Sequence, residues 1–210
     1  MTLPVQVLVL AKAPVPGRVK TRLCPPLTPA EAADVAAAAL ADTLDAVRGA
    51  DVAGRVLALD GESDAAGFDV RPQRGSSFDA RLGAALDDAA AASPLPLLVV
   101  GMDTPQLGSA GIEAAARALL TADAALGLAE DGGWWCLGLR RPRASLVLGV
   151  PASRDDTGAR QGARLREAGL SVAPLPVLRD VDTCDDALAV AALAPSGRFA
   201  PVVLRLLVAA

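Results

Sequence analysis

Histidine is absent from the 210 residues of this chain. Its absence excludes Ser-His-Asp and Cys-His hydrolase mechanisms, His-ligated zinc and the HExxH metalloprotease site. Any catalysis must therefore rely on carboxylates, on Lys and Arg, and on a hard metal ion such as Mg²⁺ or Mn²⁺.

Other residue types are scarce as well. Aromatic residues make up only 2% of the chain, so the core must be built from Ala, Val and Leu. The three cysteines form no CxxC pair, and we expect a reduced, cytoplasmic location. No run of eighteen apolar residues predicts a membrane span, and residues 1–10 lack the basic start of a signal peptide. A net charge of -4 and a pI near 4.9 argue against binding a nucleic-acid polymer.

The usual nucleotide-binding loops are also missing. The chain contains no GxGxxG, which excludes a typical dinucleotide site, and no GxxxxGK[ST], which excludes a P-loop. A nucleotide site in this protein would need a different phosphate-binding loop.

Alternating strand and helix patterns run through the chain. They predict a single α/β domain over residues 1–210, a three-layer αβα sandwich with a mainly parallel sheet. Trp134–Leu139 is interpreted as an extra strand, antiparallel to the rest, and the apolar tail Phe199–Val208 as an edge strand or a homodimer contact. The main strands are expected at Val5–Leu10, Arg55–Asp60, Leu95–Gly101, Ala124–Ala129 and Leu170–Leu178. The helices are expected from Thr28 to about Val47 and over Ser77–Ala92, Ser109–Leu120, Ala159–Ala168 and Cys184–Leu193.

A basic loop follows the first predicted strand. Lys12, Arg18, Lys20 and Arg22 lie within eleven residues of an acidic protein. Pro14 and Pro16 stiffen this segment, and Gly17 allows the backbone to turn or to approach a ligand. Such a loop suits a phosphate-bearing ligand, although taken alone it also fits a solvated basic loop.

Acidic clusters follow three further predicted strands. They contain Asp103, then Asp131 with Gly132 and Gly133, then the run Asp180–Asp186. Each cluster alone also fits a simple structural role. The first two fit turns, and in the third Thr183 or Asp182 fits the cap of the following helix. Ligands of open α/β sheets bind beyond the carboxyl ends of the strands, so together these clusters predict one site.

The combination of charges points to a metal–phosphate site. Mg²⁺ or Mn²⁺ takes one or two carboxylates together with phosphate oxygens, and Asp103 and Asp182 are the predicted metal ligands. Arg18, Lys20 and Arg22 would neutralise the phosphates and the charge on a departing diphosphate. The expected ligand is a nucleotide triphosphate or a diphosphate linked to a sugar.

Four motifs resemble those of a family of small bacterial GT-A-like glycosyltransferases of uncharacterised chemistry. The family patterns are AKxPxPGxxKTRL, GxDxPxL, DGGYYLxGL and DVDTxxDL, here Ala11–Leu23, Gly101–Leu107, Asp131–Leu139 and Asp180–Asp186. The match spans most of the chain in order. The family is similar to the nucleotide-diphospho-sugar transferases, which include phospholactate and molybdenum-cofactor nucleotidyltransferases.

The resemblance implies a role for each motif. It implies catalytic roles for Lys20, Arg22 and Asp103, and metal binding by Asp103 and Asp182. Trp134-Trp135 replaces the family's Tyr-Tyr, and the segment 73–82 only partly matches a typical QxxxDLGxRL. The implied phosphate-binding residues are Lys12, Gly17, Arg18, Lys20, Thr21 and Arg22. The implied acceptor-binding residues are Asp131, Gly132, Gly133 and Trp134.

These observations predict a metal-dependent transferase that takes a nucleotide donor and a small acceptor. Glycosyl transfer from a nucleotide-sugar is the preferred interpretation. The alternative is guanylyl or cytidylyl transfer from a nucleoside triphosphate to a small phosphorylated or hydroxy acceptor, with release of pyrophosphate. A nucleotide-binding protein without turnover and an inert scaffold that dimerises through its tail are two further alternatives.

Overall fold

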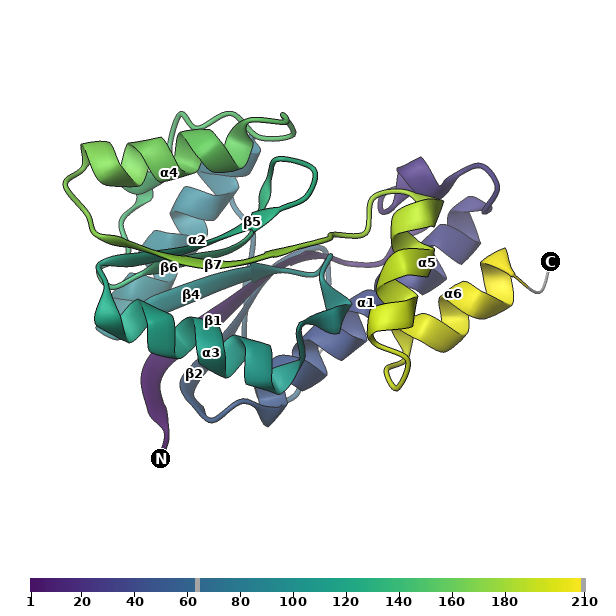
Figure 1. Cartoon of the computed structure of the whole chain (residues 1–210), viewed down its shortest axis with the longest axis horizontal. Helices are drawn as coiled ribbons and strands as arrows, with labels where there is room; N and C mark the ends of the chain where they lie inside the picture. The colour runs from purple at the N-terminus through teal and green to yellow at the C-terminus, as the bar shows by residue number, and fades with distance from the viewer. Residues whose placement is uncertain (63–64, 209–210) are drawn as a thin grey trace.

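A seven-stranded sheet forms the centre of the computed structural model, which describes residues 1–62 and 65–208 (Figure 1). The strands are β1 (Leu3–Lys12), β2 (Val52–Asp60), β3 (Asp69–Pro72), β4 (Leu97–Gly101), β5 (Ala124–Ala129), β6 (Trp134–Leu139) and β7 (Val172–Leu178). Their order in the sheet is β3-β2-β1-β4-β6-β5-β7. Only β6 runs antiparallel to its neighbours, so the predicted mainly parallel sheet and the antiparallel 134–139 strand are confirmed.

Helices cover both faces of the sheet, as the three-layer prediction requires (Figure 1). α1 (Pro29–Gly49) and α3 (Gly108–Thr121) pack on one face, and α2 (Phe78–Ala92) and α4 (Thr157–Glu167) on the other. Successive side chains of a strand point to opposite faces. Val7 of β1 accordingly joins the core under α1 and α3, while Leu8 joins the core under α2 and α4.

The C-terminal segment forms helices, and here the prediction of an edge strand is wrong. α5 (Cys184–Leu193) and α6 (Phe199–Leu207) pack against α1. This helical group lies beyond the edge of the sheet at which β1 ends (Figure 1). Phe199, Ala200 and Val203 are buried at helical spacing, which an apolar run of nine residues does not reveal without its packing partners. The predicted contact of this tail with a second copy of the chain stays a prediction.

Several helix starts were predictable from capping signals. At α1, Thr28 and Glu31 form a capping box with Pro29 in the first turn. At α5, Thr183 and Asp186 form a second box, so the predicted cap at Thr183 is confirmed. Three short 3-10 helices were not predicted: η1 (Thr21–Leu23), η2 (Pro105–Leu107) and η3 (Ala144–Leu146).

The parallel strands bring the polar loops to one edge of the sheet. β1, β4, β5 and β7 all point the same way, so the segments after Lys12, Gly101, Ala129 and Leu178 meet there. The short strand β3, which the sequence did not predict, extends the sheet beyond β2. No helix in the described ranges is both long and apolar enough to cross a bilayer.

Candidate active site

A cleft of about 310 Å³ opens at this edge of the sheet, and we call it the basic cleft. Five of the six predicted phosphate-binding residues line it. Gly17 is the exception: its φ of 76° turns the loop, but it is outside the lining. The lining comprises Leu10, Ala11, Lys12, Arg18, Val19, Lys20, Thr21, Arg22, Gln73, Phe78, Arg81, Met102, Asp103 and Asp182.

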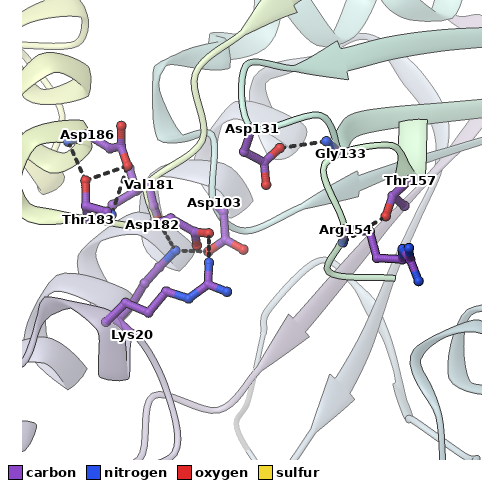
Figure 2. Close-up of polar contacts among 11 residues, drawn as sticks. Lys20, Asp103, Asp131, Gly133, Arg154, Thr157, Val181, Asp182, Thr183 and Asp186 are labelled. Atoms are coloured by element: carbon purple, nitrogen blue, oxygen red, sulfur yellow. Dashed lines mark hydrogen bonds and ion pairs between the residues drawn. The ribbon is translucent and has the colours of Figure 1, made fainter. Parts of the chain in front are cut away.

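Lys20 connects three segments of the site (Figure 2). It precedes η1 in the left-handed conformation, with φ 48°, and its side chain is only 7% exposed. Its Nζ lies 2.5 Å from Oδ1 of Asp103, at the end of β4, and donates to the carbonyl oxygen of Val181, beyond β7. The basic loop is thereby attached to two acidic segments through one ammonium group.

Arg22 makes a second connection of the same kind. Its guanidinium pairs with Asp182, while its side chain remains 68% exposed at the mouth of the cleft. Arg18 is held more loosely, with 3.9 Å between its Nη2 and Oδ1 of Asp60. The exposed arginines are therefore accessible to a ligand, whereas Lys20 is buried against its partners.

Arg81 and Gln73 also line the cleft, and the sequence did not assign them a role. The Nε of Arg81 is buried without a hydrogen-bond acceptor, and no side chain within residues 1–62 and 65–208 forms an ion pair with this arginine. Gln73 donates from Nε2 to the carbonyl oxygens of Ala11 (2.7 Å) and Ala58 (3.0 Å). The partial match of residues 73–82 to a family pattern was the available signal.

Three carboxylates gather beside the cleft and form what we call the acidic trio. Asp131, Asp180 and Asp182 each place one oxygen within 4.8 Å of the others. Burial, followed by repulsion from Asp131, raises the pKa of Asp180 to about 6. The predicted metal ligand Asp182 belongs to the trio, whereas the other predicted ligand, Asp103, is paired with Lys20.

The trio fits a hard divalent cation. It offers three carboxylates from two segments, the β5–β6 turn and the loop after β7, and carboxylates are the ligand type preferred by Mg²⁺ and Mn²⁺. A cation would also offset the repulsion that, after burial, raises the pKa of Asp180. Asp131, which the sequence analysis assigned to the acceptor, therefore lies where it could also serve a metal.

A second pocket of about 390 Å³ adjoins the cleft, and we call it the acidic pocket. It shares Arg22, Phe78 and Asp182 with the basic cleft, so the two cavities are direct neighbours. Of the predicted acceptor residues, Asp131, Gly133 and Trp134 line it. The lining comprises Arg22, Phe78, Asp131, Gly133, Trp134, Ala152, Ser153, Arg154, Asp155, Thr157, Asp180 and Asp182.

Gly132 supports the acidic pocket from behind. Its φ is 89°, and a Cβ there would lie 1.8 Å from the carbonyl oxygen of Asp155. Its own carbonyl oxygen accepts a hydrogen bond of 2.8 Å from the amide of Gly158. The β5–β6 turn and the segment 152–157 therefore form one wall, which the sequence analysis recognised only on its β5–β6 side.

Comparisons with known proteins agree with this architecture. Residues 33–154 match the family described as "uncharacterized protein conserved in bacteria", DUF2064, and no functionally curated protein matches significantly. A provisionally assigned nucleotide-diphospho-sugar transferase from Desulfovibrio desulfuricans G20 shares 23% identity with a TM-score of 0.86, over 98% of this chain and 95% of that one.

Two more distant structures share the fold. CMP:2-keto-3-deoxy-manno-octonic acid synthetase complexed with CTP has 13% identity and a TM-score of 0.58, over 91% of this chain and 98% of its own. Rv0371c from Mycobacterium tuberculosis H37Rv, complexed with manganese, has 21% identity and a TM-score of 0.54, over 90% and 98%. The predicted fold of the nucleotide-diphospho-sugar transferases is thus confirmed.

Proposed function

The chain belongs to the DUF2064 family, and we propose that it is a metal-dependent transferase that uses a nucleotide donor. The preferred reaction is glycosyl transfer from a nucleotide-sugar to a small acceptor. We assign the basic cleft to the donor phosphates, the acidic trio to Mg²⁺ or Mn²⁺, and the acidic pocket to the acceptor.

One observation carries the proposal: the two cavities meet at the Arg22–Asp182 ion pair. Arg22 and Asp182 line both cavities, and Asp182 also belongs to the trio. A diphosphate in the cleft would therefore lie beside both a guanidinium and a metal position. This juxtaposition of cations, carboxylates and an adjoining second pocket suits group transfer from a diphosphate-linked donor.

The residues of the cleft would bind the donor and stabilise the leaving group. Lys20 and Arg22 face the phosphates, and Asp103 fixes the position of the Lys20 ammonium. The acceptor oxygen attacks the anomeric carbon, the bond from that carbon to the phosphate oxygen breaks, and the nucleoside diphosphate departs. Bound Mg²⁺ or Mn²⁺ would offset the charge on the departing diphosphate.

When the acceptor hydroxyl attacks, a general base in the same pocket must take up its proton. Asp155 lines the acidic pocket and is outside the acidic trio, so a metal at the trio leaves its carboxylate available. We therefore assign proton transfer to Asp155.

Nucleotidyl transfer is a second candidate, and the charge of the basic cleft favours it. The cleft is lined by Lys12, Arg18, Lys20, Arg22 and Arg81 against only Asp103 and Asp182. A triphosphate carries more negative charge than a nucleotide-sugar and would match this excess better. In that reaction the acceptor oxygen attacks the α-phosphorus, and pyrophosphate leaves.

A melting-temperature panel tests the proposal. Nucleoside triphosphates and nucleotide-sugars are each added with Mg²⁺ or Mn²⁺. A ligand at a hundred times its Kd adds about 2.7 kcal/mol of stability, which raises Tm by roughly 5–10 °C for a chain of this size. A nucleotide-sugar shift supports glycosyl transfer, and a triphosphate shift supports nucleotidyl transfer.

Variants separate the remaining alternatives. Lys20→Ala should remove the nucleotide shift, while Arg141→Ala, a change at an exposed cation outside both cavities, should leave it intact. If Lys20→Ala changes no shift, the assignment of the basic cleft is wrong. Asp103→Asn separates an enzyme from a binding protein: unchanged nucleotide affinity, with no product from any donor even in the wild type, would indicate binding without turnover.

A further inference from the structure

The chemistry of the acidic pocket restricts the acceptor, and this inference rests on the proposed function. Four carboxylates line the pocket: Asp131, Asp155, Asp180 and Asp182. Only two cationic side chains, Arg22 and Arg154, line it with them. Like charges brought together in one pocket repel each other, so the charge balance restricts what can enter.

Both arginines already have other partners, so an anionic group on the acceptor would have to compete for them. Arg22 is paired with Asp182 at the boundary with the basic cleft. The Nε of Arg154 lies 3.5 Å from Oδ1 of Asp156. In Figure 2 the guanidinium of Arg154 is directed away from Asp131 and Asp182. Its backbone amide, not its side chain, is committed to the pocket wall through a hydrogen bond to Oγ1 of Thr157.

A metal at the acidic trio would bring the pocket close to neutrality, not to a positive charge. Arg22 balances Asp182, Arg154 is paired with Asp156 outside the lining, and a divalent cation balances two of the remaining negative charges. A phosphate or carboxylate on the acceptor would then have no uncompensated cation to pair with. An uncharged acceptor meets no such penalty.

An aromatic surface forms the apolar part of the same pocket. Trp134 and Phe78 both line it, with ring centroids 6.3 Å apart and planes inclined at 56°. Both rings are only partly buried by the protein, so part of each remains available to a ligand. The negative face of an aromatic ring attracts the electropositive C–H face of a saturated ring.

We infer that the acidic pocket takes an uncharged, hydroxyl-bearing ring compound, such as a sugar or cyclitol without phosphate or carboxylate. Its C–H face rests on Trp134 and Phe78, and its hydroxyls donate to the carboxylates of the pocket wall. The basic cleft and the acidic pocket therefore select opposite charges: an anionic donor and a neutral acceptor.

Saturation-transfer NMR on the full chain with Mg²⁺ and UDP or GDP tests this inference without requiring turnover. The probes are matched pairs that differ in one anionic group: glucose with glucose 6-phosphate, mannose with mannose 6-phosphate, and inositol with inositol phosphate. At least one uncharged member should bind, at least tenfold more tightly than its phosphorylated partner. Tighter binding of the phosphorylated members, or no binding of any uncharged member, overturns the inference.

Variants place the bound ring in the pocket. Trp134→Ala should abolish saturation transfer to the uncharged probe, and Trp134→Phe, which keeps an aromatic face, should retain it. Asp155→Asn should reduce the preference over the phosphorylated partner several-fold, because one carboxylate is removed. Unchanged transfer in Trp134→Ala would contradict the assignment.

The failure of this inference and the failure of the proposed function are distinguishable. If nucleotides raise Tm with Mg²⁺ or Mn²⁺ but anionic acceptors bind better, only the acceptor class is wrong. If no nucleotide raises Tm, the proposed function is wrong whatever the acceptor pairs show.

Discussion

The basic cleft and the acidic pocket differ in whether their charged side chains have ion-pair partners within the protein. In the cleft, Lys20 and Arg22 already have protein carboxylates as partners, in Asp103 and Asp182. In the pocket, Asp131 and Asp180 form no ion pair with any cation in the part of the chain that the structure describes. These two cations of the cleft thus have counter-ions within the cleft, whereas these two carboxylates of the pocket have none.

This difference implies two kinds of binding event. A phosphate entering the cleft competes with the carboxylates that already hold the two cations. Among the described residues, Arg22 is the one cation paired with the acidic trio, through Asp182, and a metal ion entering the trio would compete with it. Metal binding at the trio would also give the phosphates a second positive neighbour, so each event should favour the other.

The largest expected effect comes from removing the carboxylate that both regions share. Asp182→Asn takes a carboxylate from the trio and the partner from Arg22. We expect loss of the Mn²⁺-dependent rise in Tm and at least a hundredfold loss of transfer activity, about 3 kcal/mol. Differential scanning fluorimetry and a product assay measure the two effects.

Asp34→Asn is the matched control for that variant, because Asp34 is exposed on α1 and lines neither cavity. It should behave as wild type in both assays. If Mn²⁺ still raises the Tm of the Asp182→Asn variant, the metal does not bind at the acidic trio.

A second variant tests whether the wall of the acidic pocket depends on close backbone packing. Gly132→Ala places a Cβ against the carbonyl of Asp155 at a positive φ, whereas Gly67→Ala meets only the φ cost, with nothing within 4 Å. We expect about 1 kcal/mol of destabilisation at Gly67 and about 2 kcal/mol more at Gly132. Urea unfolding measures both, and equal values would show that this packing does not hold the wall.

A third variant examines Arg81, a cation of the cleft that forms no ion pair within residues 1–62 and 65–208. Arg81→Ala should weaken nucleotide affinity about tenfold, or 1.4 kcal/mol, since one charge-assisted hydrogen bond is lost. It should leave Tm without ligand unchanged or slightly higher, because an unpaired buried donor is removed. Calorimetric titration of nucleotide distinguishes this from a structural role, in which Tm would fall and affinity would not.

The smallest effect is a pH dependence from Asp180. Its pKa is raised from 3.8 to about 6, so in the absence of metal its contribution to stability is present below pH 4 and is lost as pH rises through 6. Asp180→Asn should therefore raise Tm relative to wild type at pH 7, with the difference shrinking towards pH 4. With Mn²⁺ at pH 7 the order should reverse, because wild type gains the metal.

Melting curves across this range measure the difference between the two proteins. A difference in Tm that does not vary with pH would show that Asp180 does not titrate in this window. Asp34→Asn again serves as the control for the loss of one carboxylate.

Much of the site was predictable because it follows the strand ends. The positions of Lys20, Asp103, Asp131 and Asp182 follow from a parallel sheet, whose loops meet at one edge. The capped starts of the helices at Thr28 and Thr183 follow from local hydrogen bonding, which depends on neighbouring residues only.

Other parts depend on tertiary packing and could not be predicted in the same way. Arg81 resembles any helical cation until α2 is seen to place its Nε in the wall of the cleft. The ion pair between Asp103 and Lys20 depends on how the loops after β1 and β4 pack together. The apolar tail that begins at Phe199 is compatible with either a strand or a helix. Its contacts with α1 and α5 determine that it forms a helix.

Calorimetric titration of nucleotide with and without Mn²⁺ tests most directly whether the cleft and the trio act as one site. The account predicts that saturating Mn²⁺ raises nucleotide affinity at least tenfold, that nucleotide raises Mn²⁺ affinity by the same factor, and that Asp182→Asn removes this coupling. Nucleotide binding that is independent of Mn²⁺ in the wild-type protein would contradict it.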